Sequence, residues 1–168
     1  MKKSGIIISV AIMICVMLSA SITGCKEKEK NIDIIIVRNY YMSNYTEDKI
    51  DLTNKKYWTA GPINNSLDVE EYTFVCDLDE EKISDFLRAA KQNKFLSWEK
   101  EYILPGSYHD GHQWSINICF NDLTVQESYG DNDYPDAWDE MLKAFKELTD
   151  NYILGEKSSL YERRIAEG

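Results

Sequence analysis

The pattern of apolar and polar positions along the chain predicts a series of β-strands interrupted by two helices. Short runs rich in β-branched and aromatic residues, bounded by Asn, Asp, Gly or Pro, are typical of strands. We expect strands at residues 32–42, in a hairpin over residues 48–60 that turns at 54–55, and at residues 70–78, 98–104, 114–120 and 123–129. The last two form the clearest pair, because only the turn at Asn121-Asp122 separates them.

Two segments instead repeat their apolar residues with the helical period. In the first, the apolar stripe is Ile83, Phe86, Leu87 and Ala90, with Asp79 as the expected N-cap and an end near Asn93. The second stripe consists of Trp138, Met141, Leu142, Phe145, Leu148 and Tyr152. We expect Pro135 in the first turn of this second helix and Gly155 just after its end.

The order of these elements predicts the fold class. Strands, a helix, more strands and a second helix follow one another, and each helix has a single apolar side. Such helices pack on one face of a sheet that is mainly antiparallel, so we expect an α+β fold of two layers.

The N-terminal segment is different in character and predicts export. Lys2 and Lys3 precede an apolar run from Gly5 to Leu18, which is typical of a secretory signal and short for a membrane span. Ile22-Thr23-Gly24-Cys25 then resembles the bacterial lipobox. This resemblance implies that the Cys25 thiol receives a diacylglyceryl group and that a peptidase cuts between Gly24 and Cys25.

These observations divide the chain into four parts. We expect a lipoprotein signal peptide at residues 1–24, a lipidated cysteine and charged tether at 25–31, a single α+β domain at 32–155, and a polar C-terminal tail at 156–168. Loss of the signal would remove Lys2 and Lys3 and change the net charge from −10 to −12. A body this acidic argues against nucleic-acid binding and would be repelled by anionic lipid. We therefore expect an extracytoplasmic protein that the lipid on Cys25 holds at the cell membrane.

Two cysteines remain in the expected domain, Cys76 and Cys119. In an exported protein such a pair suggests a disulfide bond. The alternation of their strands places Cys76 on an apolar face and Cys119 on a more polar face, which favours two separate thiols. Both interpretations stay open at this point.

The acidic stretch GDNDYPDAWDE, residues 130–140, is a candidate calcium site. Counted from Asp131, an EF-hand loop would need glycine at its sixth position and glutamate at its twelfth, but Asp136 and Leu142 stand there. A non-standard calcium site built from Asp131, Asp133 and Asp136 remains an alternative. We favour a structural role, because these acids and Pro135 suit the start of a helix.

The sequence HDGH, residues 109–112, is a second candidate metal site. His109, Asp110 and His112 offer ligands for zinc, and Asp131 could complete the set. The alternative is a hydrophilic loop between strands that bends at Gly111.

No sequence motif assigns a catalytic residue. The chain has no GxSxG elbow and no glycine-rich phosphate loop. Among its aromatic residues, Trp114 and Trp138 lie on core stripes, whereas a second group lies at strand ends or in loops, where it suits binding: Tyr40, Tyr41, Tyr45, Tyr108 and Tyr134. We therefore expect a non-enzymatic domain that binds a protein or glycan partner. The alternative is a metal-dependent or carboxylate-based hydrolase of the cell envelope that uses HDGH and the acidic stretch.

The second half of the chain also carries a pattern of aromatic, glycine and polar residues. It consists of Trp98, Tyr102, Asp110-Gly111, Gln113-Trp114, Tyr129-Gly130, Asn132, Tyr134-Pro135 and Trp138. Over roughly residues 70–150 this pattern resembles a family of bacterial, Firmicutes-like lipoproteins to which no activity is assigned. The resemblance implies an exported single domain and transfers no catalytic residue.

Overall fold

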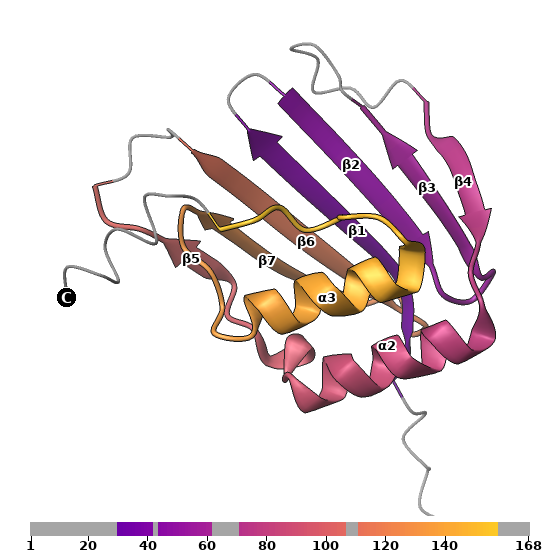
Figure 1. Cartoon of the computed structure of the whole chain (residues 1–168). Helices are drawn as coiled ribbons and strands as arrows, with labels where there is room; N and C mark the ends of the chain where they lie inside the picture. Colours follow the sequence, from indigo (N-terminus) through magenta and orange to yellow (C-terminus); the bar gives the residue numbers. More distant parts are fainter. Residues whose placement is uncertain (1–29, 42–43, 62–70, 107–110, 158–168) are drawn as a thin grey trace, which may run out of the picture.

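The structure is a computed structural model that describes residues 30–41, 44–61, 71–106 and 111–157 of the chain. One seven-stranded sheet carries two helices on the same face (Figure 1). The strands are β1 (Ile32–Tyr41), β2 (Asn44–Asp51), β3 (Lys56–Ala60), β4 (Thr73–Asp77), β5 (Glu101–Ile103), β6 (His112–Phe120) and β7 (Val125–Asp131). Their spatial order is β4-β3-β2-β1-β6-β7-β5, and every neighbouring pair is antiparallel except β5 and β7. The predicted two-layer α+β fold is therefore confirmed.

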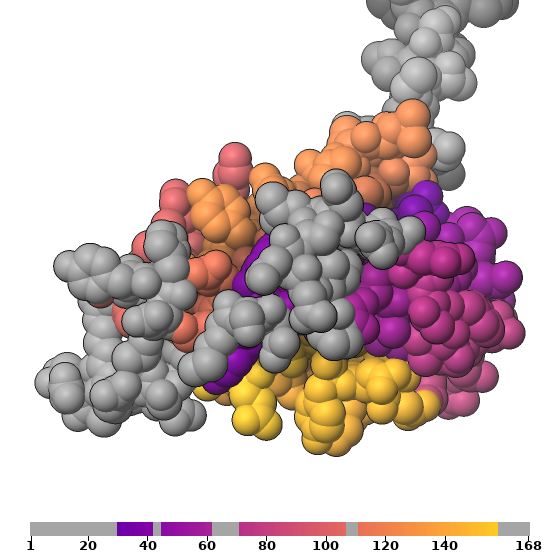
Figure 2. All heavy atoms as spheres, turned by 90° about the horizontal axis from the view of Figure 1, so that it is seen from above, coloured from indigo at the N-terminus to yellow at the C-terminus, as the bar shows by residue number. Residues whose placement is uncertain are grey.

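The core lies between the sheet and the helices. In β1 the side chains of Ile35 and Val37 point into it, and their partners Ile118 and Ile116 on β6 are equally buried. The buried and half-buried positions of β6 alternate along its whole length, as the sequence predicts for a strand with one face on the core. Seen from above, the C-terminal part of the chain, which includes α3 (Trp138–Thr149), lies in yellow along one side of the molecule (Figure 2).

The first predicted helix is confirmed as α2 (Glu80–Gln92). The carboxylate of Asp79 accepts hydrogen bonds from the backbone N–H groups of Glu81 and Lys82, at 2.8 and 3.2 Å. The helix buries Ile83 and Phe86 against the sheet, and it ends at Asn93 in the C-cap position. A single turn of 3₁₀-helix, η2 (Phe95–Ser97), follows it.

The second predicted helix exists, but both of its expected ends are wrong. α3 begins at Trp138, three residues after Pro135, and Ala137 in the N-cap position gives no side-chain cap. The residues before it form a turn that buries Tyr134. The helix ends at Thr149, because Asp150 takes up the left-handed conformation there (φ 59°) that was expected of Gly155.

The segment after α3 turns back over the sheet instead of prolonging the helix. Ile153 and Leu154 in this segment are each 1% exposed. Tyr152, which the sequence places on the apolar stripe of the helix, lies outside the helix and is 65% exposed. Burial of two large aliphatic residues explains why the chain reverses here.

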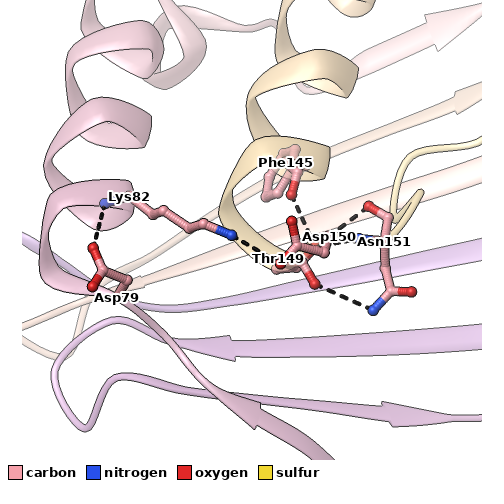
Figure 3. Close-up of polar contacts among 6 residues, drawn as sticks. All are labelled: Asp79, Lys82, Phe145, Thr149, Asp150 and Asn151. Carbon is pink, nitrogen blue, oxygen red and sulfur yellow. Dashed lines mark hydrogen bonds and ion pairs between the residues drawn. The ribbon is translucent and has the colours of Figure 1, made fainter.

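The start of α2 and the end of α3 lie side by side, so the two helices are antiparallel. The Lys82 ammonium of α2 is 2.8 Å from the carboxylate of Asp150, beyond the last turn of α3 (Figure 3). Beside it, the Thr149 hydroxyl donates to the Phe145 carbonyl at 2.9 Å. Exposed ion pairs of this kind contribute at most about 1 kcal/mol, so packing rather than charge holds the helices together.

The bounds of several predicted strands need correction, and β2, for example, begins at Asn44 rather than at residue 48. β5 covers only three residues of the expected 98–104, and residues 98–100 between η2 and β5 are neither helix nor strand. β7 starts at Val125 rather than Leu123, which adopts a positive φ of 67° in the turn. A register shift in the β3–β4 pairing breaks the expected alternation, so that Phe74 is 50% exposed although it was placed on an apolar face.

Cys76 and Cys119 are free thiols. Cys76 lies on edge strand β4, and three strands separate it from Cys119 on β6. Neighbouring strands are about 4.8 Å apart, so the two sulfur atoms are too distant for a disulfide bond in this fold. Among the described residues, no helix is long and apolar enough to cross a membrane.

Candidate functional site

The two candidate metal motifs meet at one end of the sheet. β6 begins at His112 and β7 ends at Asp131, and the two strands are antiparallel neighbours. The backbone N–H of His112 donates to the Asn132 side-chain oxygen at 3.0 Å, and the Asn132 N–H donates to the His112 carbonyl at 3.0 Å. The structure therefore brings Gly111 and His112, the described half of HDGH, beside the acidic stretch. His109 and Asp110 lie outside the described residues.

His112 is fully buried, and both of its ring nitrogens already have partners. Nε2 lies 3.0 Å from Oδ1 of Asn39, and Nδ1 lies 3.2 Å from the Tyr134 hydroxyl. The Asn39 side-chain amide donates to the Ile153 carbonyl at 2.7 Å, so its oxygen faces the ring and accepts. Nε2 consequently carries the proton, and Nδ1 accepts from Tyr134. Burial lowers the pKa of His112 to about 4, so the ring is neutral at pH 7.

The carboxylates of the acidic stretch also make local hydrogen bonds. Asp131 accepts from the side-chain amide of Asn132 at 2.8 Å, and Asp133 accepts from the N–H of Tyr134 at 3.0 Å. In the described parts of the chain no three His, Cys, Asp or Glu side chains form a group that could hold a metal ion. The contacts of His112, Asp131 and Asp133 indicate structural roles.

An aromatic cluster fills the core beside His112. It consists of Trp98, Tyr102, Trp114, Tyr134 and Trp138, with neighbouring ring centroids 4.7 to 6.3 Å apart. The indole N–H of Trp114 donates to the Asp133 carbonyl at 2.9 Å, and that of Trp138 donates to the Gly155 carbonyl at 3.0 Å. Each polar group of the two indoles is thus satisfied inside the protein.

Two glycines make room for this cluster. A Cβ atom at Gly130 would lie 2.4 Å from the Trp114 nitrogen, and one at Gly155 would lie 2.7 Å from the His112 ring. The pattern in the second half of the chain is therefore largely a packing pattern. Tyr134, which we expected at a loop surface suited to binding, is only 3% exposed, and this expectation is wrong.

The face of the sheet opposite the helices presents a different set of side chains. The strand register aligns six residues in one row across six strands, which we call the cross-strand row: Phe74, Trp58, Lys49, Ile36, Asn117 and Glu127. The Lys49 ammonium lies 5.2 Å from the centre of the Trp58 ring, and Trp58 meets Phe74 edge-on at 6.2 Å. The side-chain oxygen of Asn117 is buried and has no hydrogen-bond partner among the described residues.

A polar cluster flanks the cross-strand row on β1 and β2. Glu47 is only 3% exposed, and its carboxylate accepts from Arg38 Nε at 2.6 Å and from the hydroxyls of Tyr45 and Tyr72. Burial, together with the hydrogen bond to Glu47, raises the pKa of Tyr45. Three donors hold this carboxylate in place, which makes it a rigid support for the face rather than a free catalytic base.

Sequence reasoning identified Tyr40 and Tyr45 near this face but missed Arg38, Glu47 and Trp58. The Tyr40 and Tyr45 rings do lie together, with centroids 4.8 Å apart, and Tyr41 is 50% exposed. Extending the second expected strand back from residue 48 to 44 would have revealed the alternation that puts Tyr45 and Glu47 on one face. Tyr108 lies outside the described residues.

Comparisons of the chain with models of protein families, with curated proteins and with solved structures found no match. The resemblance to exported lipoproteins thus stays a prediction from the sequence.

Proposed function

We propose that the protein is a lipid-anchored, extracytoplasmic binding protein. Its binding surface is the face of the sheet that carries no helix in the described part of the chain, which we call the open face. The observation that carries the proposal is the placement of both helices on one face, opposite the cross-strand row (Figure 1). The signal-like N-terminus and the lipobox around Cys25 support the location.

The dimensions of the cross-strand row favour an extended ligand. Six aligned strands spaced by about 4.8 Å give a row of roughly 24 Å. Along it the face offers aromatic rings at β4 and β3, a lysine at β2, and the half-buried side chain of Asn117 at β6. Rings stack on flat apolar surfaces, while the lysine and the amide fix orientation. An extended glycan or a peptide segment of a partner protein suits this arrangement.

The anchor is tested by Cys25→Ser in cells fed a labelled fatty acid. We expect the wild-type chain to take up the label and the variant to lose it completely, because the serine hydroxyl is a far weaker nucleophile than a thiol. Undiminished labelling of the variant would disprove lipidation at Cys25.

The binding face is tested by photo-crosslinking in intact cells. We expect a photoreactive amino acid in place of Phe74 to form a discrete adduct, which Trp58→Ala should weaken at least several-fold. The matched control carries the same amino acid in place of Lys143, which is 75% exposed on the helical layer. Equal adducts at residues 74 and 143, or none at 74, would contradict the proposal.

A further inference from the structure

The start of β1 marks one end of the molecule, which we call the basal end. Here the chain enters the sheet beside the turn between β6 and β7. The N–H of Asn121 donates to the Asn31 carbonyl at 3.0 Å, and Ile32 pairs with Phe120. In Figure 1 β1 begins below α2, so the last turns of this helix and η2 lie at the same end.

A groove at the basal end is lined by lysines and apolar side chains. Its volume is about 500 Å³, and one wall is formed by Lys30, Asn31 and Ile32. The other wall comes from α2 and from the chain that follows it, with Lys91 and Lys94 beside Leu87 and Leu96. Basic and leucine side chains in one groove are the composition of surfaces that lie on lipid headgroups.

Exposed aliphatic side chains are concentrated at this end. Leu123, at the tip of the β6–β7 turn, is 91% exposed and has a positive φ of 67°. Val125 beside it is 61% exposed, and Leu96 and Leu87 are 42% and 40% exposed. A β-turn tip is usually polar, so a leucine held there at positive φ gives this end an apolar tip that suits contact with an apolar environment.

Three lysines gather at the groove of the basal end, although the protein as a whole is acidic. They are Lys30, Lys91 and Lys94, and the Lys30 ammonium lies 3.8 Å above the Phe120 ring. The acidic residues beside this end include Asp33, Asp51, which pairs with Ile34, and Asp122. The carboxylate of Asp122 accepts from the N–H and the hydroxyl of Thr124 in the turn. This end would therefore tolerate an anionic surface that the acidic body avoids.

The sequence places this end next to the proposed anchor. Lys30 follows Cys25 by only five residues, a distance of roughly 17 Å when extended. We propose that the basal end rests on the surface of an anionic phospholipid bilayer, with its lysines on the phosphates and Leu123 in the interface. This inference rests on the lipid anchor of the proposed function. In this orientation the open sheet face would stand upright on the membrane surface and would not be covered by it.

The test uses the full-length protein, purified with its anchor and reconstituted into vesicles. A fluorescent amino acid replaces either Leu123 or Tyr41, which lies at the opposite end of the ten-residue strand β1. Vesicles of equal parts phosphatidylglycerol and phosphatidylcholine carry brominated acyl chains that quench the fluorophore. We expect quenching several-fold stronger at residue 123 than at residue 41, and a smaller difference in pure phosphatidylcholine.

Two double variants with the same change of charge distinguish contact of the basal end with the bilayer from attachment by the lipid on Cys25 alone. Lys91→Gln with Lys94→Gln should remove most of the quenching at residue 123, because each lysine near an anionic membrane changes the equilibrium by about fivefold. Lys143→Gln with Lys146→Gln on α3 changes the charge equally and should leave the quenching unchanged. Both pairs include a lysine of the last helical turn, and thermal unfolding of each double variant checks that its fold is intact.

The outcomes for the anchor and for the docking surface are distinct. A chain that does not float with the vesicles has no anchor, and then the proposed function fails as well. A chain that floats but is quenched equally at residues 123 and 41 overturns only the docking proposal. Quenching that appears solely when a second protein is added would also overturn it, since the surface would then belong to a protein partner.

Discussion

At the scale of single residues, two buried ionisable groups, His112 and Asp48, lie in surroundings that disfavour their charged forms. His112 is 0% exposed and its ring is neutral, with a tyrosine hydroxyl and an asparagine oxygen as partners. Asp48 is also buried, on the face of β2 that points toward the helices, and it accepts from the Tyr57 hydroxyl at 2.7 Å. Both groups sit in surroundings that favour the uncharged form, so each links stability to pH.

His112 should make the protein less stable in mild acid. Its pKa is about 4 in the folded protein and 6.5 in the unfolded chain, so only the unfolded chain binds a proton between these values. Stability should therefore fall as the pH is lowered from 6.5 to 4, by at most about 3 kcal/mol. Denaturant unfolding at several pH values measures this, and His112→Gln should show a flatter dependence. An identical pH dependence in both proteins would contradict the prediction.

For Asp48 we predict the opposite change of stability with pH. Burial raises its pKa above the ordinary 3.8, although hydrogen bonds from Tyr57 and Thr59 oppose the shift. Ionisation of the Asp48 carboxyl in the folded protein therefore lowers stability as the pH rises above 3.8. Asparagine at this position does not ionise, so Asp48→Asn avoids this loss of stability. We expect the variant to have a higher melting temperature than the wild type at pH 7 and no advantage below pH 3.8. A lower melting temperature at pH 7 would show that the charged form is the one stabilised.

At the scale of elements, the two helices differ in how their ends are stabilised. α2 has a side-chain cap at Asp79, acids in its first turn and Lys91 in its last turn, all visible as a local pattern. α3 lacks a side-chain N-cap and ends at a non-glycine residue in the left-handed conformation. Packing of Trp138 and Phe145, which are both completely buried, compensates for these weak ends.

Removing the cap of α2 should have a measurable cost. We expect Asp79→Ala to lower the free energy of unfolding by about 1 kcal/mol, since the N–H groups of Glu81 and Lys82 lose their acceptor. Asp85→Ala is the matched control, because this acid lies on the exposed side of the same helix and only pairs with Arg88. The difference in free energy of unfolding between the two variants, measured by chemical denaturation, gives the contribution of the cap. Equal losses of stability in both variants would contradict the prediction.

At the scale of the whole molecule, the segment 151–157 completes the core. It follows α3, crosses the sheet and buries Ile153 and Leu154. Its backbone also accepts from Asn39 and from the Trp138 indole, which joins β1 to the start of α3. The expected domain limit at residue 155 lies within this segment.

Truncation tests the importance of this segment. A chain that stops after Asp150 should lose at least about 3 kcal/mol of stability, because it loses the burial of two large aliphatic side chains. A chain that stops after Lys157 should unfold at the same denaturant concentration as the full protein. Loss of stability in the longer truncation would place part of the core beyond residue 157.

The sequence alone determined the fold class, most strands and the limits of α2, because these depend on periodicity and capping over a few neighbouring residues. It also drew attention to the meeting of HDGH with the acidic stretch. The sequence correctly placed Trp114 and Trp138 in the core, but only the tertiary structure decided this question for Tyr134 and Trp58. The local sequence does not distinguish the roles of these two aromatic residues. Tyr134 packs on His112, whereas Trp58 belongs to the cross-strand row.

The physical reason is the distance in sequence between the deciding partners. His112 has a structural role because its ring contacts Asn39, 73 positions away. Glu47 is held in place by the hydroxyl of Tyr72, 25 positions away. A one-residue shift of register, as in β4, moves a side chain from one face to the other. Local patterns contain no information on such pairings, so the role of each side chain was decided by the assembled sheet.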